Sequence, residues 1–211
     1  EPSERDAFMD GAAPTFDALR EATGVDRVFS IGKLNESIQR ALMKNDTLWF
    51  NTGTTPELDK PLTADLLLIN SIRERFWWVT LKNVAVPIHL LRFVKDEYEI
   101  ASLREAFEIQ TAIYERIMRS VKPGCSEALG QAIYDYELTM RPDYVGHALG
   151  AAPHASLIVA SSANAAIPHY RANNRTVQDG DLVLIDGGVT VNGYSSDITR
   201  TFPVNGKFTP R

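Results

Sequence analysis

A β-hairpin signal in the last third of the chain constrains the fold most. Asp181–Val189 carries apolar residues on both faces, which is typical of a buried strand. Asn192-Gly193 follows it and is the kind of residue pair that two-residue hairpin turns favour, because both turn positions need a positive φ. A returning strand is predicted over Tyr194–Val204 and a shorter strand over Ser156–Ala160. The chain is therefore expected to contain an antiparallel sheet.

Each arm of this hairpin carries one aspartate outside the turn. Asp186 ends the apolar run, and Asp197 lies on the returning arm. If the loop is Val191-Asn192, the two aspartates lie directly opposite each other, whereas a loop at Asn192-Gly193 puts Asp186 opposite Thr199. Side chains alternate along a strand, and cross-strand partners share a face. Both registers therefore predict that Asp186 and Asp197 point to the same side of the sheet.

Two carboxylates on one polar face admit several explanations. A buried carboxylate without a partner is costly, so Asp186 needs a hydrogen-bond donor, a cation or a metal ion. Hard divalent cations prefer such oxygen ligands. The pair could equally share a proton or bind a lysine or arginine. Single aspartates beside glycine usually serve turns, and we expect this role for Asp179 and Asp181.

Two helices are predicted before this sheet. The first begins at Asp96 and Glu99, which have the spacing of a capping box, and ends at Pro123-Gly124. Ser126 can cap the second helix. The predicted apolar faces consist of Ile100, Leu103, Phe107, Tyr114, Ile117 and Val121 in the first helix, and of Leu129, Ile133, Tyr136 and Leu138 or Met140 in the second. This order of elements makes residues 93–211 an α+β portion.

Residues 1–92 show alternating helix and strand patterns instead. Short runs rich in Val, Ile, Phe and Trp predict strands, and the amphipathic stretches between them predict helices. The predicted elements are a helix over Pro14–Ala22 with Gly24 as its C-cap, a strand over Arg27–Ile31, a helix that Asn35 caps, a strand over Thr47–Asn51 and a helix over Leu62–Trp78. Val79–Arg92, which contains Pro87, is interpreted as a connector. Residues 1–92 are therefore expected to form a separate α/β domain.

Composition excludes several classes of protein. Hydrophobic residues make up 44% of the chain, which argues against a disordered protein. The 22 basic and 27 acidic residues give a net charge of −5, which disfavours a nucleic-acid partner. Apolar runs are too short to cross a bilayer, so no membrane partner is expected. A single cysteine excludes an internal disulfide and a cysteine-based zinc cluster, and a reducing cytoplasm is the expected location.

The hairpin also resembles a known family. Residues 180–188, GDLVLIDGG, and residues 192–208, which begin NGYSSDITR, resemble the Xaa-Pro aminopeptidase (aminopeptidase P) and prolidase family. The resemblance is specific over Ala155–Arg211 and extends more loosely through the two predicted helices. It implies the first half of a pita-bread metallopeptidase domain, with two divalent metal ions that are usually manganese. Residues 1–90 resemble the later part of the family's N-terminal creatinase-like domain.

The resemblance assigns roles to three residues. Asp186 resembles the family's first metal ligand, and Asp197 resembles the second, which bridges both ions. His169 resembles a catalytic histidine that hydrogen-bonds the substrate or intermediate and helps proton movement. Without the family, His169 would be interpreted as a loop histidine that follows Pro168. His147 and His154 are expected to be structural or loosely substrate-facing, and His89 and Cys125 to be packed.

The chain departs from the family in its ligand set. The family uses five metal ligands in the order Asp, Asp, His, Glu, Glu. Here all 4 histidines precede Asp186, and no His, Asp or Glu follows Asp197. We therefore expect an internal piece of a longer enzyme whose remaining ligands lie outside residues 1–211. Such a piece is expected to be inactive alone. It is expected to bind metal ions only if a segment outside residues 1–211 supplies the missing ligands.

The resemblance implies release of the N-terminal residue from peptides with proline at the second position, by a metal-activated water. The alternatives are a prolidase that cleaves Xaa-Pro dipeptides, a creatinase-like hydrolase without metal, and an inactive relative that binds a peptide or protein partner. An uncovered apolar sheet face would favour self-association, so a homo-oligomer is expected.

Overall fold

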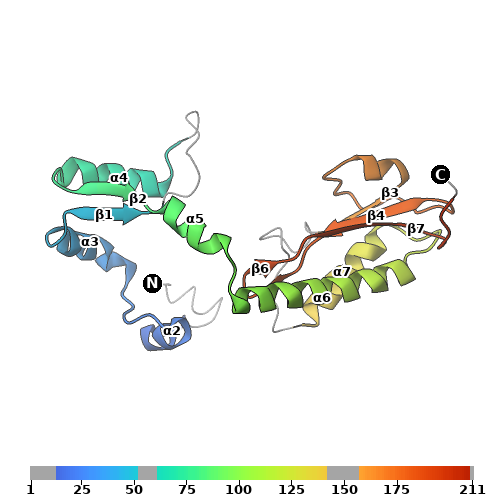
Figure 1. Cartoon of the computed structure of the whole chain (residues 1–211), viewed down its shortest axis with the longest axis horizontal. Helices are drawn as coiled ribbons and strands as arrows, with labels where there is room; N and C mark the ends of the chain where they lie inside the picture. Colours follow the sequence, from blue (N-terminus) through green and yellow to red (C-terminus); the bar gives the residue numbers. More distant parts are fainter. Residues whose placement is uncertain (1–12, 52–60, 142–156, 210–211) are drawn as a thin grey trace. The chain divides into compact units, whose positions relative to one another are not determined.

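The computed structural model describes residues 13–51, 61–141 and 157–209 (Figure 1). The chain consists of two compact units, unit 1 over Glu1–Val94 and unit 2 over Lys95–Arg211. Among the described residues, no helix combines the length and the apolar character needed to cross a membrane.

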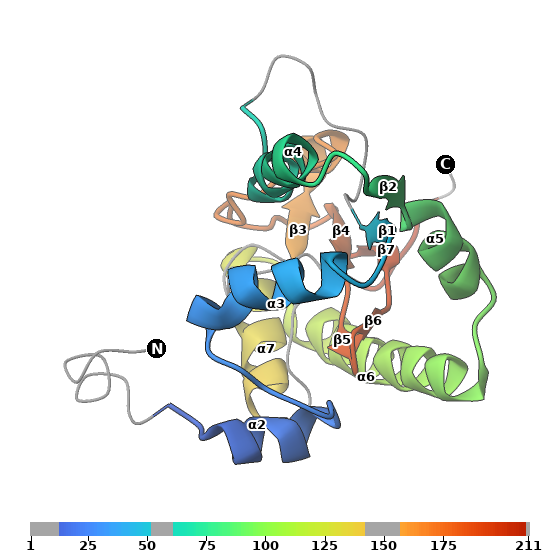
Figure 2. The same cartoon turned by 90° about the vertical axis from the view of Figure 1, so that its left-hand side faces the viewer.

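Unit 1 is a small α/β layer. Its elements are α2 (Phe16–Thr23), η1 (Ile31–Lys33), α3 (Leu34–Leu42), β1 (Thr47–Phe50), α4 (Ala64–Arg75), β2 (Thr80–Asn83) and α5 (Ala85–Phe93). β1 and β2 pair in parallel, with Thr47 opposite Thr80, and α4 lies between them in the sequence. α3 and α4 lie on opposite sides of the strand pair (Figures 1 and 2). The α/β prediction for this part is confirmed.

Two local predictions in unit 1 are wrong, and one is confirmed. Arg27–Ile31 forms no strand, because the Ser30 hydroxyl accepts a hydrogen bond from Gly32 N at 3.3 Å and begins η1 at Ile31. η1 leads directly into α3, so Asn35 is an interior residue of that helix and not its cap. Gly24, with a φ of 70°, ends α2 as predicted.

The interpretation of Val79–Arg92 as a connector is also wrong. Thr80–Asn83 pairs with β1 along its whole length, and α5 follows almost directly. The Asn83 side chain accepts a hydrogen bond from Ala85 N at 2.8 Å, at the start of the helix. Pro87 is the third residue of α5, in the first turn, where a missing N–H costs no helical hydrogen bond. The proline is therefore compatible with a helix here.

Unit 2 packs two helices against an antiparallel sheet. Its elements are α6 (Glu97–Ser120), α7 (Ala128–Thr139), β3 (Ile158–Ser161), η2 (Ser162–Ala166), β4 (Leu182–Gly187), β5 (Thr190–Val191), β6 (Tyr194–Ser195) and β7 (Ile198–Pro203). β4 lies between β3 and β7. α6 begins at the predicted capping box, in which Glu99 N donates to Asp96 Oδ1 at 2.9 Å and Asp96 N donates to Glu99 Oε2 at 2.7 Å. The α+β prediction is confirmed.

The main core of unit 2 lies between the helices and one face of the sheet. Its buried members are Ala106, Ile109, Ile113, Tyr114, Ile117, Val121, Tyr134, Leu138, Leu157, Val159, Val177, Val183, Ile185, Val189, Val191 and Val204. The predicted helix faces are partly wrong, since Ile100, Phe107 and Tyr136 are 40%, 41% and 53% exposed, whereas Leu138, one of two alternatives at the end of the second face, is buried. α7 buries the face that contains Gly130 instead, because a residue without a side chain allows close approach to the sheet.

Candidate functional site

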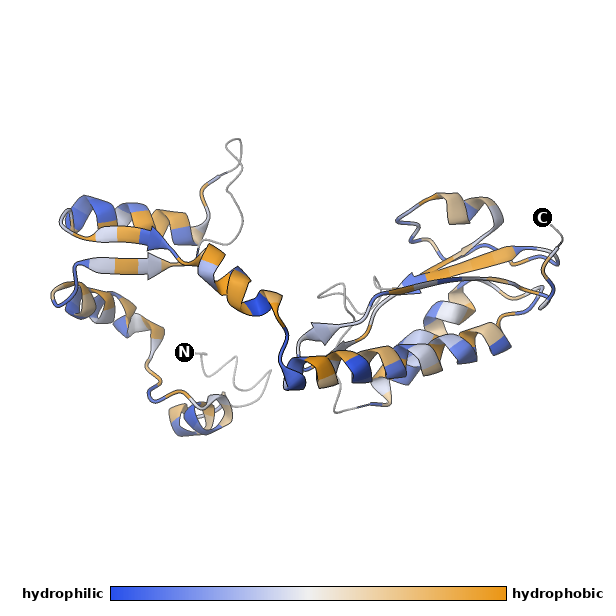
Figure 3. Cartoon of the chain, viewed as in Figure 1, coloured by the Kyte–Doolittle hydropathy of each residue, from blue (hydrophilic) through white to orange (hydrophobic). Residues whose placement is uncertain are grey.

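β4 positions Asp186 in the middle strand of the sheet. This strand is apolar over most of its length (Figure 3), and Asp186 is its last residue before Gly187. Asp186 lies opposite Ile158 of β3 and Thr199 of β7. The Thr199 hydroxyl donates a hydrogen bond to Asp186 Oδ1 at 2.5 Å. The half-buried carboxylate therefore has a donor, as the physical cost of burial requires.

The hairpin turn decides between the two predicted registers. Asn192 and Gly193 have φ angles of 49° and 83°, and Val191 pairs with Tyr194 across them. Positive φ at both central positions is the geometry of the two-residue turn that Asn-Gly favours. The loop is therefore Asn192-Gly193, and the alternative loop at Val191-Asn192 is wrong.

Asp197 lies beside the Asp186–Thr199 pair. It is exposed and directly precedes β7. Ser196 N donates to Val189 O at 2.9 Å, so the hairpin keeps the same register next to this residue. Asp197 is two positions from Thr199, the partner of Asp186. The alternation of side chains along a strand therefore favours both carboxylates on one side of the hairpin.

Tyr114 of α6 is affected by the charges of both aspartates. Its hydroxyl donates a hydrogen bond to Ile198 O at 2.8 Å, beside Asp197. Burial raises the pKa of Tyr114 above its usual value, and the negative charges of Asp186 and Asp197 raise it further. The phenol therefore stays protonated at neutral pH and keeps its hydrogen bond to the hairpin backbone.

Three buried side chains form hydrogen bonds with the backbone around the aspartates. Gln110 Nε2 donates to Gly187 O at 2.5 Å, and the Tyr134 hydroxyl donates to Gly188 O. The buried Ser196 hydroxyl accepts a hydrogen bond at 3.0 Å from the backbone N–H that precedes β5. The sequence patterns predicted a role for none of these three residues. A glutamine within a buried helix face is the signal that could have identified Gln110.

His169 lies in a turn on the face of the sheet that carries Asp186. Tyr170 N donates to Ile167 O at 3.1 Å and closes this turn, and the His169 side chain is exposed. Tyr170 packs with Ile158, the cross-strand partner of Asp186. Cross-strand partners share a face. The segment with His169 therefore covers the Asp186 side of the sheet, opposite α6 and α7 (Figure 1).

A buried carboxylate that the sequence patterns did not predict contacts the His169 segment. Glu127 directly precedes α7 and is 0% exposed. Burial alone would raise its pKa, but hydrogen bonds from Ser161, Arg175 and Tyr170 outweigh burial and lower the pKa below its usual value. Glu127 is therefore ionised at neutral pH. Its position gave no signal, since acidic residues are common at exposed helix starts.

The other candidates from the sequence have structural roles or lie outside the described residues. His89 is exposed on α5, so the expectation that it is packed is wrong. Cys125 is half-buried. Asp181 accepts a hydrogen bond from Gln178 N at 2.7 Å, as the turn role predicts, and also pairs with Arg175. His147 and His154 lie outside the described residues.

The oxygen atoms near Asp186 fit part of a site for hard divalent cations. Carboxylates and hydroxyl groups are ligand types that such cations prefer, and both Asp186 and Asp197 belong to one hairpin. Within the described ranges, no three His, Cys, Asp or Glu side chains come close enough together to bind a metal ion. Asp186 and Asp197 could therefore contribute to a metal centre but would need ligands from outside those ranges.

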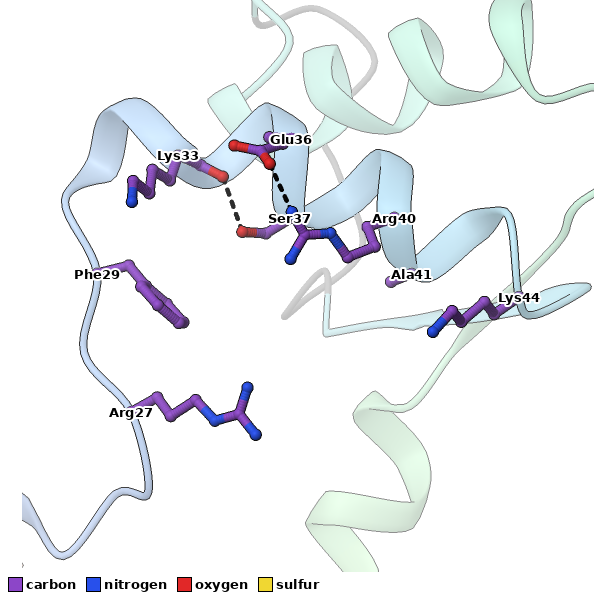
Figure 4. A pocket seen from close by; sticks show the side chains of 8 residues that line it. All are labelled: Arg27, Phe29, Lys33, Glu36, Ser37, Arg40, Ala41 and Lys44. Atoms are coloured by element: carbon purple, nitrogen blue, oxygen red, sulfur yellow. Dashed lines mark hydrogen bonds and ion pairs between the residues drawn. The ribbon is translucent and has the colours of Figure 1, made fainter.

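Unit 1 contains a basic hollow of about 360 Å³ (Figure 4). It is lined by Arg27, Phe29, Lys33, Glu36, Ser37, Arg40, Ala41 and Lys44. Arg40 pairs with Glu36 at 2.5 Å, and the Ser37 hydroxyl donates to Lys33 O at 2.8 Å. The hollow contains none of the candidate catalytic or metal-binding residues predicted from the sequence, and its basic side chains are exposed. We therefore assign it no chemical role.

Known proteins resemble the chain along most of its length. Residues 101–211 match the model of metallopeptidase family M24. The Xaa-Pro aminopeptidase of Escherichia coli (strain K12) is 35% identical over 203 residues, which cover 92% of this chain and 43% of that protein. The Xaa-Pro aminopeptidase of Haemophilus influenzae is 38% identical over 118 residues, which cover 56% of this chain and 26% of that protein.

Solved structures give the same result. Pseudomonas aeruginosa aminopeptidase PepP matches with a TM-score of 0.81 and 30% identity, over 100% of this chain and 46% of that chain. Proline aminopeptidase P II from Yersinia pestis matches with a TM-score of 0.79 and 30% identity, over 99% of this chain and 47% of that chain. The chain thus spans less than half the length of these relatives and has part of their pita-bread fold. It belongs to metallopeptidase family M24.

Proposed function

We propose that the protein containing this sequence releases the N-terminal residue from Xaa-Pro peptides by hydrolysis. The observation that carries the proposal is the hairpin with Asp186 and Asp197, which lies inside the residues that match the M24 family. The naming of the E. coli relative as an Xaa-Pro aminopeptidase supports this substrate class. This chain would supply only part of the active site.

Asp186 and Asp197 are the proposed metal ligands of this chain. Two carboxylates on one side of a hairpin repel each other, and bound cations would offset that repulsion. Thr199 orients the Asp186 carboxylate through Oδ1, and we propose Oδ2 as its ligand atom. Two divalent ions, proposed to be manganese, would lower the pKa of a bound water so that a nucleophile exists near neutral pH. The remaining ligands would come from outside the described residues.

His169 is the proposed substrate-contacting residue. Its imidazole is exposed, and its segment covers the Asp186 side of the sheet. A ring N–H can donate a hydrogen bond to the carbonyl oxygen before proline, where negative charge develops during hydrolysis. The same ring has a nitrogen that can accept a proton and one that can donate a proton during the reaction. These two abilities make His169 the catalytic candidate of this chain.

We further propose a cytoplasmic homo-oligomer. One cysteine in the whole sequence accords with a reducing compartment. Large apolar side chains such as Trp77 and Phe93, which are 83% and 81% exposed, offer apolar surface that association could cover.

Substitution of the two aspartates in the metal-loaded intact protein tests the proposal. Asp186→Asn and Asp197→Asn should each lower kcat/KM on an Xaa-Pro peptide by roughly a hundredfold or more and should reduce the bound manganese. Asp179→Asn is the matched control, because this exposed turn aspartate is hydrogen-bonded to Asn205 at 2.9 Å, and it should leave both quantities unchanged. Full metal content and turnover in both site variants would refute the ligand assignment.

The same assay separates the alternatives. Turnover confined to Xaa-Pro dipeptides would indicate a prolidase. Peptide binding without hydrolysis and without bound metal would indicate an inactive member of the fold.

A further inference from the structure

The carboxylate of Glu127 accepts an unusual number of hydrogen bonds. Oε1 accepts from Ser161 N and Ser161 Oγ, both at 2.7 Å, and from Asn164 Nδ2 at 3.1 Å. Oε2 accepts from the Tyr170 hydroxyl at 2.8 Å and from Arg175 N at 3.0 Å. Because Glu127 is 0% exposed and ionised, these donors replace the water that the charge has lost.

All these donors belong to one segment, Ser161–Arg175. Ser161 ends β3, Asn164 lies in η2, Tyr170 follows His169 directly, and Arg175 lies on the return toward β4. One carboxylate thus contacts the segment at both ends and at two points between them. Hydrogen bonds to a charged acceptor are stronger than those between neutral groups.

The backbone around Glu127 forms hydrogen bonds with the stretch of chain that leads into β4. Glu127 N donates to Arg175 O at 2.9 Å. Gly124 N donates to Val177 O, and Val177 N donates to Cys125 O, each at 2.8 Å. The carboxylate therefore has a fixed position against which the segment can be ordered.

Tyr170 connects the Glu127 carboxylate to His169, the residue directly before it in the sequence. Its hydroxyl is bonded to Glu127 and also accepts a hydrogen bond from Asn164 Nδ2 at 2.9 Å, while its backbone N–H closes the turn from Ile167. We propose that Glu127 is a positioning residue, which sets the position of the His169 imidazole through the Tyr170 hydroxyl. This inference deepens the proposed function and rests on it, because it assumes that His169 acts on the substrate.

Hydrogen exchange of Tyr170→Phe tests the structural half of this proposal. The substitution removes one donor and leaves the ring that packs against the sheet. We expect the backbone amide of residue 170 to exchange at least about tenfold faster in the variant, since a hydrogen bond to a charged group is lost. The amides of β4 should keep their protection. Tyr136→Phe, at a 53% exposed site on α7, is the matched control and should change neither. An unchanged exchange rate of the residue 170 amide in Tyr170→Phe would overturn the proposal.

A double-mutant cycle in the metal-loaded intact protein tests the functional half. If Glu127 and Tyr170 act through His169, Tyr170→Phe lowers kcat about tenfold with little change in KM, and adding it to His169→Ala lowers kcat no further. A purely structural role would instead reduce kcat equally in both backgrounds. Additive effects would therefore overturn the positioning role even if the segment is loosened.

The two proposals fail in different ways. If His169→Ala leaves kcat unchanged, the catalytic role of His169 is refuted, and with it the positioning role, whatever the exchange data show. If His169→Ala lowers kcat but Tyr170→Phe changes neither exchange nor kcat, only the role of Glu127 is refuted. Glu127→Gln should change exchange and kcat in the same direction as Tyr170→Phe and more strongly, because an amide group would face several donors. A smaller effect than that of Tyr170→Phe would contradict the proposal.

Discussion

The two units differ in how much of their apolar surface the described residues bury. Unit 2 buries a continuous core between its helices and sheet, and a second cluster on the opposite face. In unit 1, the buried hydrophobic residues within the described ranges are Leu42, Ile72 and Ala85. Trp77 and Leu91 of this unit are 83% and 80% exposed. A parallel strand pair needs cover on both faces, which two helices on so small a sheet supply only partly.

Buried polar groups follow the same division. In the described part of the chain, Ser102, Gln110, Glu127, Ser161, Asn173 and Ser196 are the buried polar side chains, and all belong to unit 2. They form hydrogen bonds with the backbone of the hairpin, the His169 segment, β3 or α6, or with side chains beside them. Unit 2 is therefore ordered by contacts among its described residues, whereas the described residues of unit 1 bury few apolar side chains and no polar one. The candidate site lies in the unit with the fixed core.

A pair of leucine truncations should give the largest contrast between the units. Leu138→Ala in α7, at a 6% exposed position, should lower the free energy of unfolding of unit 2 by about 2–5 kcal/mol, because it leaves a cavity in the core. Leu91→Ala in α5 should change stability by no more than about 0.5 kcal/mol, because the side chain is already in water. Urea unfolding measures both. Equal losses would show that unit 1 buries α5.

Loss of the buried carboxylate should have a smaller effect that depends on pH. Glu127→Gln should lower the free energy of unfolding of unit 2 by about 1–3 kcal/mol at pH 7. The folded-state pKa of Glu127 lies below its usual 4.5, so its contribution is fully present above that pH and is lost as the pH falls through the folded pKa. Urea unfolding across acid pH should therefore show a decline in the wild type that is weaker in Glu127→Gln.

Glu115→Gln is the control for this pH effect, because the Glu115 carboxylate is exposed and pairs with Arg119 on the surface of α6. It should retain the acid dependence of the wild type. An acid dependence that is identical in Glu127→Gln and the wild type would contradict the assigned role of the buried charge.

Two glycine substitutions should give the smallest contrast. A Cβ on Gly130 would lie 3.0 Å from Val159 Cγ2, whereas a Cβ on Gly32 would meet only Ser30 Oγ, at 3.7 Å. Gly130→Ala should therefore destabilise unit 2 by about 1 kcal/mol, since crowding outweighs the gain in helix propensity. Gly32→Ala should be neutral within about 0.5 kcal/mol. Thermal unfolding checks both, and a stabilising Gly130→Ala would show that α7 can move away from the sheet.

Sequence signals that act between near neighbours predict the local structure correctly in most cases. The capping box of Asp96 and Glu99, the C-cap at Gly24 and the turn at Asn192-Gly193 all formed as predicted. Each depends on residues within three or four positions of one another. The error at Asn35 is of the same local kind, because Ser30 offered a competing start a few residues earlier.

The sequence by itself determined the order of helices and strands in unit 2, the hairpin and the expectation that Asp186 and Asp197 share one side of it. The tertiary structure decided that Thr80–Asn83 is a strand, because its partner β1 lies more than a helix away along the chain. It also decided which helix faces are buried and that Glu127 contacts Tyr170, 43 positions later. The physical reason is the distance along the chain between the groups that interact. Caps and turns depend on adjacent backbone groups, whereas strand pairing and burial depend on groups that only the folded chain brings together.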